Sequence, residues 1–185
     1  MALLPLALGC GELGKVDQGR VIEYDQAKGV VTLIQDKKAE PGNPDYNTLP
    51  PHAYTIPTDT HEMGPEPKAG KRMKLDTKAQ EIVIFDKDTK NFKKINYIPI
   101  DKKEGVGRDD PLVAGKKFPL IDKEKKTISI YSGRQKLLVV FSLPDEYFKM
   151  PGDTWDAGDE VRIYYKEPGK ALRLMNISKT DIFKK

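Results

Sequence analysis

The chain has little cysteine, little histidine and no long hydrophobic run. Its single cysteine, Cys10, excludes an internal disulfide, a cysteine-rich zinc site and an iron–sulfur cluster. No apolar segment approaches the roughly 18 residues of a membrane-spanning helix. The mean hydropathy of −0.59 agrees with this, so the sequence excludes a polytopic membrane protein.

Arginine is also scarce. The 185 residues include 32 Lys and Arg against 28 Asp and Glu, a net charge of +4, and only six of the cations are arginine. Nucleic-acid binders use arginine with interleaved aromatic residues, whereas the lysines here fall at turns and strand faces, as in residues 122–126. We therefore expect no nucleic-acid partner. The balanced charge and the 38% hydrophobic content indicate a folded chain of one to one and a half domains.

The position of the single cysteine near the N-terminus suggests a role for it. Residues 1–9 form an apolar run that ends in the small residue Gly9, directly before Cys10. The run resembles the end of a bacterial lipoprotein signal peptide, which is cut before a cysteine that then carries lipid. It departs from that pattern because Ala7 replaces the usual leucine and no Lys or Arg precedes the apolar stretch. A start codon upstream would explain the missing charge. The alternative is a short apolar N-terminus that packs on the domain, with Cys10 an ordinary thiol.

We accordingly predict that residues 1–9 are the remnant of a signal peptide, that Cys10 is lipidated, and that residues 10–185 form a single all-β domain. Several acyl chains on one cysteine anchor a protein stably to a membrane. Gly11, not Asp, follows the cysteine. By resemblance to the bacterial sorting rule, this predicts outer-membrane retention, with the domain facing the periplasm.

Strand signals dominate the rest of the chain. Six runs rich in β-branched and aromatic residues are expected to be strands, and no window keeps a helical periodicity over three turns. A short helical turn capped by Asp145 is expected at residues 144–150. The six runs are residues 21–24, 30–34, 82–85, 128–131, 137–141 and 161–165.

A hairpin pattern recurs along the chain. Asp25, Asp76 and Asp122 each precede apolar residues six and eight positions later, and Lys166 keeps this spacing. An aspartate at the start of a tight loop accepts hydrogen bonds from backbone N–H groups two or three residues on. The units start 51, 46 and 44 residues apart, a spacing that also suits a small β-propeller. We favour an antiparallel β-barrel or sandwich, because propeller blades need four strands each. The strand opening at residues 158–164 also resembles those of small SH3-like or OB-like barrels.

Two long loops interrupt the strands. Residues 36–72 hold half of the 14 prolines and both histidines, and we expect an extended excursion there. Long loops often bind ligands or partners, so this segment ranks first as a binding surface and residues 101–117 rank second. Packing is the alternative role, in which Tyr46, Tyr54 and Ile56 fasten the loop to the domain.

One stretch of this loop carries a family resemblance. Residues 62–76, running on into Ile82-Val-Ile-Phe-Asp86, resemble an uncharacterised bacterial lipoprotein family, a domain of unknown function. The likeness spans most of the mature chain. It implies a secreted, anchored protein and no particular reaction.

Motifs for catalysis and metal binding are weak. His52 and His61, with Met63, Asp59 and Glu62, have the chemistry to surround copper or zinc, but surface histidines are the simpler interpretation. Residues 86–91 begin like a calcium loop but have Lys90 where a ligand belongs, so they indicate a turn. The sequence has no Gly-x-Ser-x-Gly elbow, dinucleotide loop or Gly-Lys-Ser/Thr motif. Asp153, Asp156 and Asp159 are expected to be polar turn residues, with a calcium site as the alternative.

Together these features predict a lipid-anchored protein of the bacterial cell envelope that is not an enzyme and has no cofactor. Its expected role is that of an accessory or scaffolding subunit that docks a protein partner through the Pro-rich loop or an exposed strand edge. The alternative is a periplasmic β-barrel that binds a small molecule or a metal. A docking protein needs an exposed apolar patch, whereas a binding barrel needs a closed apolar pocket.

Overall fold

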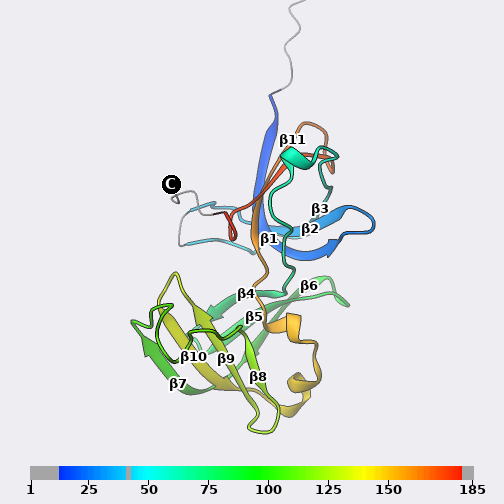
Figure 1. The fold of residues 1–185 in the computed structure, drawn as a ribbon. Coiled ribbons are helices and arrows are strands. Elements are labelled where there is room, and N and C mark those ends of the chain that lie inside the picture. Colours follow the sequence, from blue (N-terminus) through cyan, green and yellow to red (C-terminus); the bar gives the residue numbers. More distant parts are fainter. Residues whose placement is uncertain (1–12, 41–42, 181–185) are drawn as a thin grey trace, which may run out of the picture.

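The protein is an all-β structure of two lobes. The computed structural model describes residues 13–40 and 43–180, which form twelve strands and three short 3₁₀ helices (Figure 1). The all-β prediction is confirmed, and all six runs expected to be strands lie in strands. The strands are β1 (Lys15–Asp25), β2 (Val30–Gln35), β3 (His52–Thr55), β4 (Arg72–Asp76), β5 (Glu81–Asp86), β6 (Asn91–Asn96), β7 (Ile98–Glu104), β8 (Leu120–Asp122), β9 (Thr127–Ser132), β10 (Leu137–Ser142), β11 (Glu160–Tyr165) and β12 (Ala171–Asn176). The helices are η1 (Thr60–Glu62), η2 (Asp145–Lys149) and η3 (Gly152–Trp155).

The upper lobe, at the top of Figure 1, is one curled antiparallel sheet in the order β12-β11-β1-β2-β3. Its concave side buries a core that includes Val21, Leu33, Ile163 and Leu174. The two edges of the sheet approach each other where the Thr55 N–H donates to the Gly169 carbonyl at 2.8 Å. No ladder of strand pairing closes this gap among the described residues, so the sheet is not a barrel.

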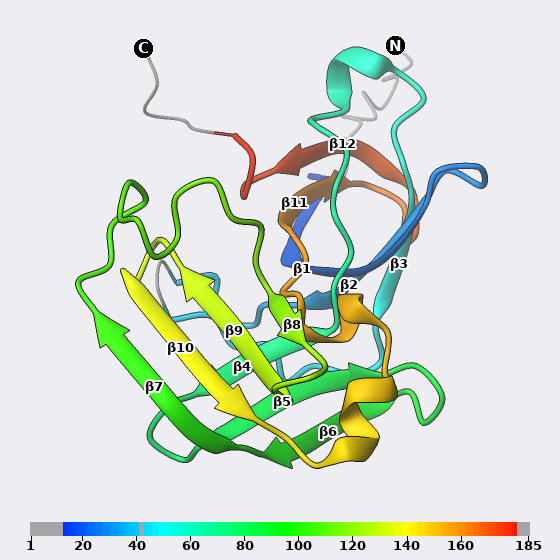
Figure 2. The same cartoon turned by 60° about the horizontal axis from the view of Figure 1, so that its bottom comes forward.

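The lower lobe is a sandwich of two antiparallel sheets (Figure 2). One has the order β4-β5-β6 and the other β7-β10-β9-β8. Between them lies the largest core, formed by residues of β5, β6, β9 and β10 and closed at one end by η2 and η3. Trp155 of η3 is fully buried in this core. The sandwich alternative of the sequence prediction therefore describes the fold, and barrel closure does not.

A third cluster joins the lobes. Ile22 and Ile34 from the upper sheet pack with Met73, Val83 and Phe85 from β4 and β5. All five side chains are at most 8% exposed. The chain crosses this junction where it leaves and re-enters the upper lobe, next to residues 70 and 158.

The predicted hairpin chemistry is present at the turns. Asp25, Asp76 and Asp122 each accept backbone N–H bonds from residues two or three positions on, at 2.9–3.1 Å. Asp86 does the same for Asp88 at 2.9 Å, so residues 86–91 form a turn, as expected. These four aspartate turns, and a fifth turn that starts at Ser132, each end in a left-handed residue, and only the first of these residues is glycine. They are Gly29, Gln80, Lys90, Lys126 and Lys136, with φ between 50° and 61°.

Some local expectations need correction. The Pro-rich segment 36–72 contains strand β3 and helix η1, so it is not wholly irregular. The second loop begins at residue 105, not 101, because β7 extends to Glu104. The helical turn at residues 144–150 is η2, but Asp145 does not cap it; its carboxylate accepts from Lys126 Nζ at 2.7 Å. The signal-peptide remnant and Cys10 lie outside the described residues.

Candidate functional site: an arginine-lined cleft between the lobes

The Pro-rich segment is fastened to the body of the protein. Tyr46 and Tyr54 are 5% and 4% exposed, and Ile56 packs on the core of the upper lobe. The packing role that the sequence offered as an alternative is therefore present. A binding role for the same segment stays a prediction.

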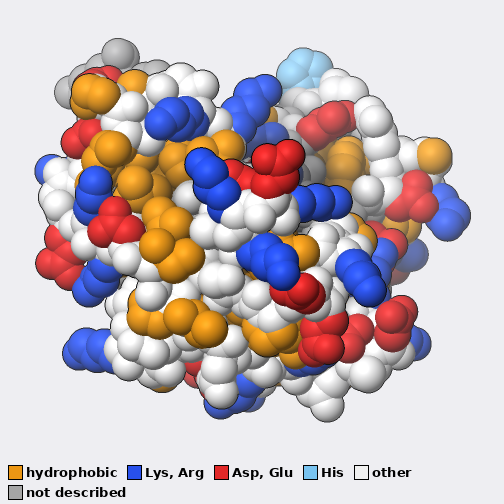
Figure 3. All heavy atoms as spheres, turned by 90° about the horizontal axis from the view of Figure 1, so that it is seen from below, with side chains coloured by type: hydrophobic (Ala, Val, Ile, Leu, Met, Phe, Trp, Pro, Cys, Tyr) orange, Lys and Arg blue, Asp and Glu red, His pale blue; other side chains and the backbone are white. Residues whose placement is uncertain are grey.

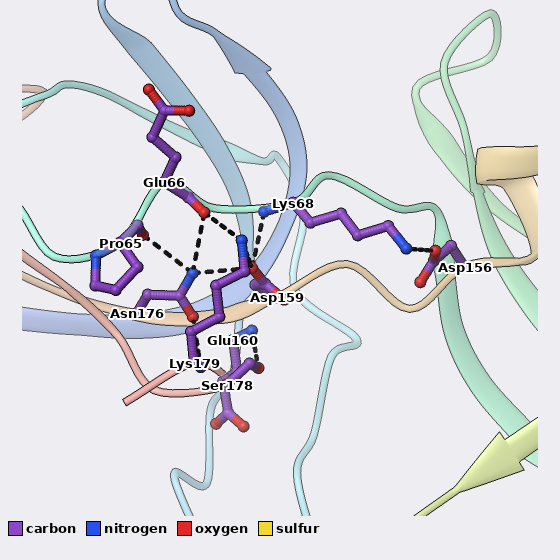
Figure 4. Close-up of polar contacts among 9 residues, drawn as sticks. All are labelled: Pro65, Glu66, Lys68, Asp156, Asp159, Glu160, Asn176, Ser178 and Lys179. Atoms are coloured by element: carbon purple, nitrogen blue, oxygen red, sulfur yellow. Dashed lines mark hydrogen bonds and ion pairs between the residues drawn. The ribbon is translucent and has the colours of Figure 1, made fainter. Parts of the chain in front are cut away.

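A polar network ties this segment to the C-terminal strand (Figure 4). Asn176, fully buried, donates through Nδ2 to the Pro65 carbonyl at 3.2 Å and to Asp159 Oδ2 at 2.8 Å. The Lys68 N–H also donates to Asp159, at 2.8 Å, and Lys179 Nζ donates to the Glu66 carbonyl at 2.6 Å. Three segments far apart in sequence are thereby held at one point.

His52 belongs to a second network, around the buried carboxylate of Asp17. His52 Nδ1 lies 2.8 Å from Asp17 Oδ2, and the Tyr54 hydroxyl donates to the same oxygen. Gln35 Nε2 donates to Asp17 Oδ1 at 3.1 Å. Burial and the neighbouring Asp17 carboxylate raise the pKa of Tyr54, which keeps it a donor. These bonds compensate for burying a carboxylate that is only 6% exposed.

The residues considered for metal binding do not converge. His61 Nδ1 lies 3.1 Å from Asp59 Oδ1, while Glu62 forms an ion pair with Arg173 and Met63 packs on the upper core. Within residues 13–40 and 43–180, no three His, Cys, Asp or Glu side chains gather as ligands would.

The three spaced aspartates likewise separate. Asp153 lies near Lys71 at 3.3 Å, Asp156 pairs with Lys68, and Asp159 lies 3.3 Å from Lys179. Each carboxylate thus has its own lysine. Asp153 lies in helix η3, and Asp156 and Asp159 lie in the irregular segment that leads into β11.

A cleft of about 830 Å³ lies between the two lobes. Its walls come from the end of the Pro-rich segment near Tyr46, from β4, from the β9–β10 hairpin and from residues 157–160. Neither histidine lines it. Its cationic lining residues are Arg20, Lys38, Arg72, Lys74 and Arg134, and its acidic ones are Asp45 and Glu160.

Two of the arginines that line this cleft are held by hydrogen bonds to backbone carbonyls. Arg20 Nη1 donates to the carbonyls of Arg72 at 3.1 Å and Met73 at 2.9 Å, and its guanidinium carbon lies 4.3 Å from the centre of the Tyr46 ring. Arg72 donates through Nε to the Trp155 carbonyl at 2.9 Å. Among the described residues neither guanidinium has a carboxylate partner, unlike Arg173, which pairs with Glu62.

The electrostatics of the pair are unfavourable in the protein alone. Burial, together with the positive charge of Arg20, lowers the pKa of Arg72 to about 10, although Asp156 opposes this shift. Burial likewise raises the pKa of Tyr46 to about 12. Arg20 Nε and the Tyr46 hydroxyl are buried without a hydrogen-bond partner among the described residues. A buried polar group without a hydrogen-bond partner lowers the stability of the folded protein. Because two such groups lie together here, we consider the cleft a candidate functional site.

Sequence reasoning missed this site. Arg20 and Arg72 are two of only six arginines, but they lie 52 residues apart and belong to no motif. One local signal was available. Arg20 stands between Gly19 and Val21 within a segment expected to be a strand, so a buried arginine there would need polar partners.

A second candidate surface is the edge strand β7. All seven of its residues are exposed, including Ile98 at 67% and Ile100 at 55%. Seen from below, the lower lobe shows hydrophobic side chains gathered mainly toward one side, among scattered charges (Figure 3). Pro99, a bulge at Ile100 and the charges of residues 101–104 interrupt this edge, and such features discourage uncontrolled strand pairing.

The family to which the chain belongs follows from comparison with known proteins. The family described as a domain of unknown function (DUF4881) matches residues 12–185, and the chain is a member of it. No curated protein and no solved structure matches the chain. Membership in an uncharacterised family is thus confirmed.

Among the described residues, no helix has the length and apolarity to span a membrane.

Proposed function

We propose that this protein is a lipid-anchored, non-enzymatic accessory protein of the bacterial cell envelope that docks a protein partner. The anchor rests on the apolar run before Cys10, and outer-membrane attachment facing the periplasm rests on Gly11. β1 starts at Lys15, and its first residues lie at the end of the upper lobe away from the lower lobe (Figure 1). Lipid on Cys10 therefore keeps the upper lobe near the membrane and leaves the lower lobe accessible.

The observation that carries the docking role is the exposure of β7. Ile98 and Ile100 leave apolar surface in water on an edge strand, and burial of one such side chain is worth about 1.5–3 kcal/mol. The unpaired backbone groups of the edge add hydrogen-bonding capacity for a partner's extended segment. The alternative, a barrel that encloses a small molecule or a metal, has less support because the described sheets do not close.

The anchor is tested by mass spectrometry of the protein purified from its host membrane. We expect an N-terminal peptide that begins at Cys10 and carries acyl chains. A Cys10→Ser variant should leave the membrane fraction while keeping its fold. An intact Met1 on a protein found in the soluble fraction would contradict the proposal.

Docking is tested by placing a photo-crosslinking amino acid at Ile98 in the membrane-bound protein. We expect one defined crosslinked product with an envelope protein, and its loss when Ile100 is changed to Asp. The matched control is a crosslinker at Leu172, which is 46% exposed in the upper lobe. The same product from both positions, or none from Ile98, would argue against β7 as the docking edge.

A further inference from the structure

We propose that the cleft between the lobes binds a small anionic ligand, whose phosphate or carboxylate oxygens lie between Arg20 and Arg72. This inference does not depend on the lipid anchor or on docking at β7. It assigns a ligand class to a site that the family description leaves open.

The charge around the cleft selects an anion. Five cationic side chains line it against two acidic ones. Lys74 is already engaged by Asp76 at 2.9 Å, whereas Arg20 and Arg72 have no carboxylate partner among the described residues. Two neighbouring guanidinium groups repel each other, and an oxyanion between them reverses that repulsion.

The two guanidinium groups are held in place before any ligand arrives. Two backbone carbonyls and the Tyr46 ring fix Arg20, and the Trp155 carbonyl fixes Arg72. These bonds use Nη1 of Arg20 and Nε of Arg72. Each guanidinium group therefore keeps further N–H groups that can donate to a ligand. Arginine binds carboxylate and phosphate through paired N–H groups, and fixed side chains lose little entropy on binding.

The size and the walls of the cleft favour a small organic anion. A volume of about 830 Å³ is within the usual range for small-molecule sites, roughly 300–1,000 Å³. Met73, Leu75 and Val83 supply apolar wall beside the arginines. The orphaned Tyr46 hydroxyl adds a polar group that a ligand oxygen can satisfy.

Thermal-shift and calorimetric titrations of the full chain test this inference, with inorganic phosphate and succinate as probes at constant ionic strength. We expect a saturable rise in Tm with at least one probe and none with chloride. The probe that binds distinguishes a phosphate from a carboxylate ligand. Equal effects of all three salts would overturn the proposal, since they would reflect screening alone.

Variants locate the binding. Arg72→Lys keeps the positive charge but loses the paired N–H donors of the guanidinium group. We expect its affinity for the anion to fall about tenfold. Because this buried change risks the fold, Arg134→Gln at the exposed rim provides a second variant, with an expected loss of about twofold. Arg162→Gln, an exposed change outside the cleft, is the control and should bind as wild type. Unchanged affinity in both cleft variants, or equal losses in the control, would overturn the assignment.

Discussion

At the scale of single residues, two glycines make the junction of the lobes possible. A Cβ on Gly158 would lie 2.3 Å from the Val21 carbonyl oxygen, and this residue has a φ of +61°. A Cβ on Gly70 would lie 2.3 Å from the Gly158 nitrogen. Backbone segments from both lobes therefore touch here with no space for a side chain.

Replacing Gly158 tests this contact. We expect Gly158→Ala to lower the free energy of unfolding by about 3 kcal/mol, because it combines a backbone clash with a left-handed conformation. Urea denaturation followed by circular dichroism measures the change. Gly107→Ala is the matched control, since nothing lies within 4 Å of a Cβ there. A similarly small change in the free energy of unfolding for both variants would show that the backbone at the junction can move to make space for a side chain.

At the scale of elements, the repeated hairpin turn depends on ionised aspartates. The backbone N–H of Ala79, with Lys74 and the N–H of Lys78, lowers the pKa of Asp76 from 3.8 to about 2. Backbone hydrogen bonds also lower the pKa values of Asp25 and Asp86. A carboxylate with a lowered pKa stabilises the folded state above its unfolded pKa, and that contribution is lost as the pH falls through the folded value.

We therefore expect the free energy of unfolding to decrease as the pH falls from about 4 to about 2. Urea denaturation across this range gives the slope, and carboxyl NMR titration identifies the groups responsible. Asp76→Asn should make the slope shallower. Asp109→Asn, at an exposed carboxylate without a hydrogen bond among the described residues, should leave it unchanged. Identical slopes in both variants would mean that the turn aspartates do not control acid stability.

At the scale of the whole molecule, the cluster of Ile22, Ile34, Met73, Val83 and Phe85 couples the lobes. Each lobe has its own core, so the shared cluster decides whether they unfold together. The chain has one tryptophan, Trp155, and it is buried in the lower lobe. Its fluorescence therefore reports the lower lobe, while far-ultraviolet circular dichroism reports both.

In the wild-type protein we expect the two signals to follow a single transition in urea. Phe85→Ala should destabilise the protein by about 3–4 kcal/mol and separate the two transitions, since it removes a large side chain from the junction. Phe118→Ala, a partly buried change on the outer side of the lower lobe, should shift both signals together. Separate transitions already in the wild type would show that the lobes are independent domains.

The strands were predictable from the sequence because their signal is local. Runs such as residues 82–85 and 137–141 are apolar and β-branched, and each lies in a strand. Strand β7 gave no such signal, since Pro99 and the charges of residues 101–104 break its alternation. β3 was hidden because only four residues, within a proline-rich stretch, form it.

The cleft was not predictable for a different reason. Arg20 and Arg72 meet only because the middle of β1 lies against the start of β4, and that contact depends on how the sheets pack. Sequence separation also hid the pairing of β1 with β11, which joins Gln18 to Arg162. The aspartate turns needed no such long-range information, so they could be predicted correctly.

The strand order of the upper lobe has a consequence for how the protein is made. β1 lies between β2 and β11, so one of its two neighbours, residues 160–165, is synthesised near the end of the chain. The core of the lower lobe, in contrast, comes from the continuous stretch of residues 75–155. During translation the lower lobe has all its strands first, while the N-terminal strands wait with an open edge for the last part of the chain. The sheet that contains the N-terminal strand is therefore the last part of the fold to be completed, because β11 and β12 are the final strands of the chain.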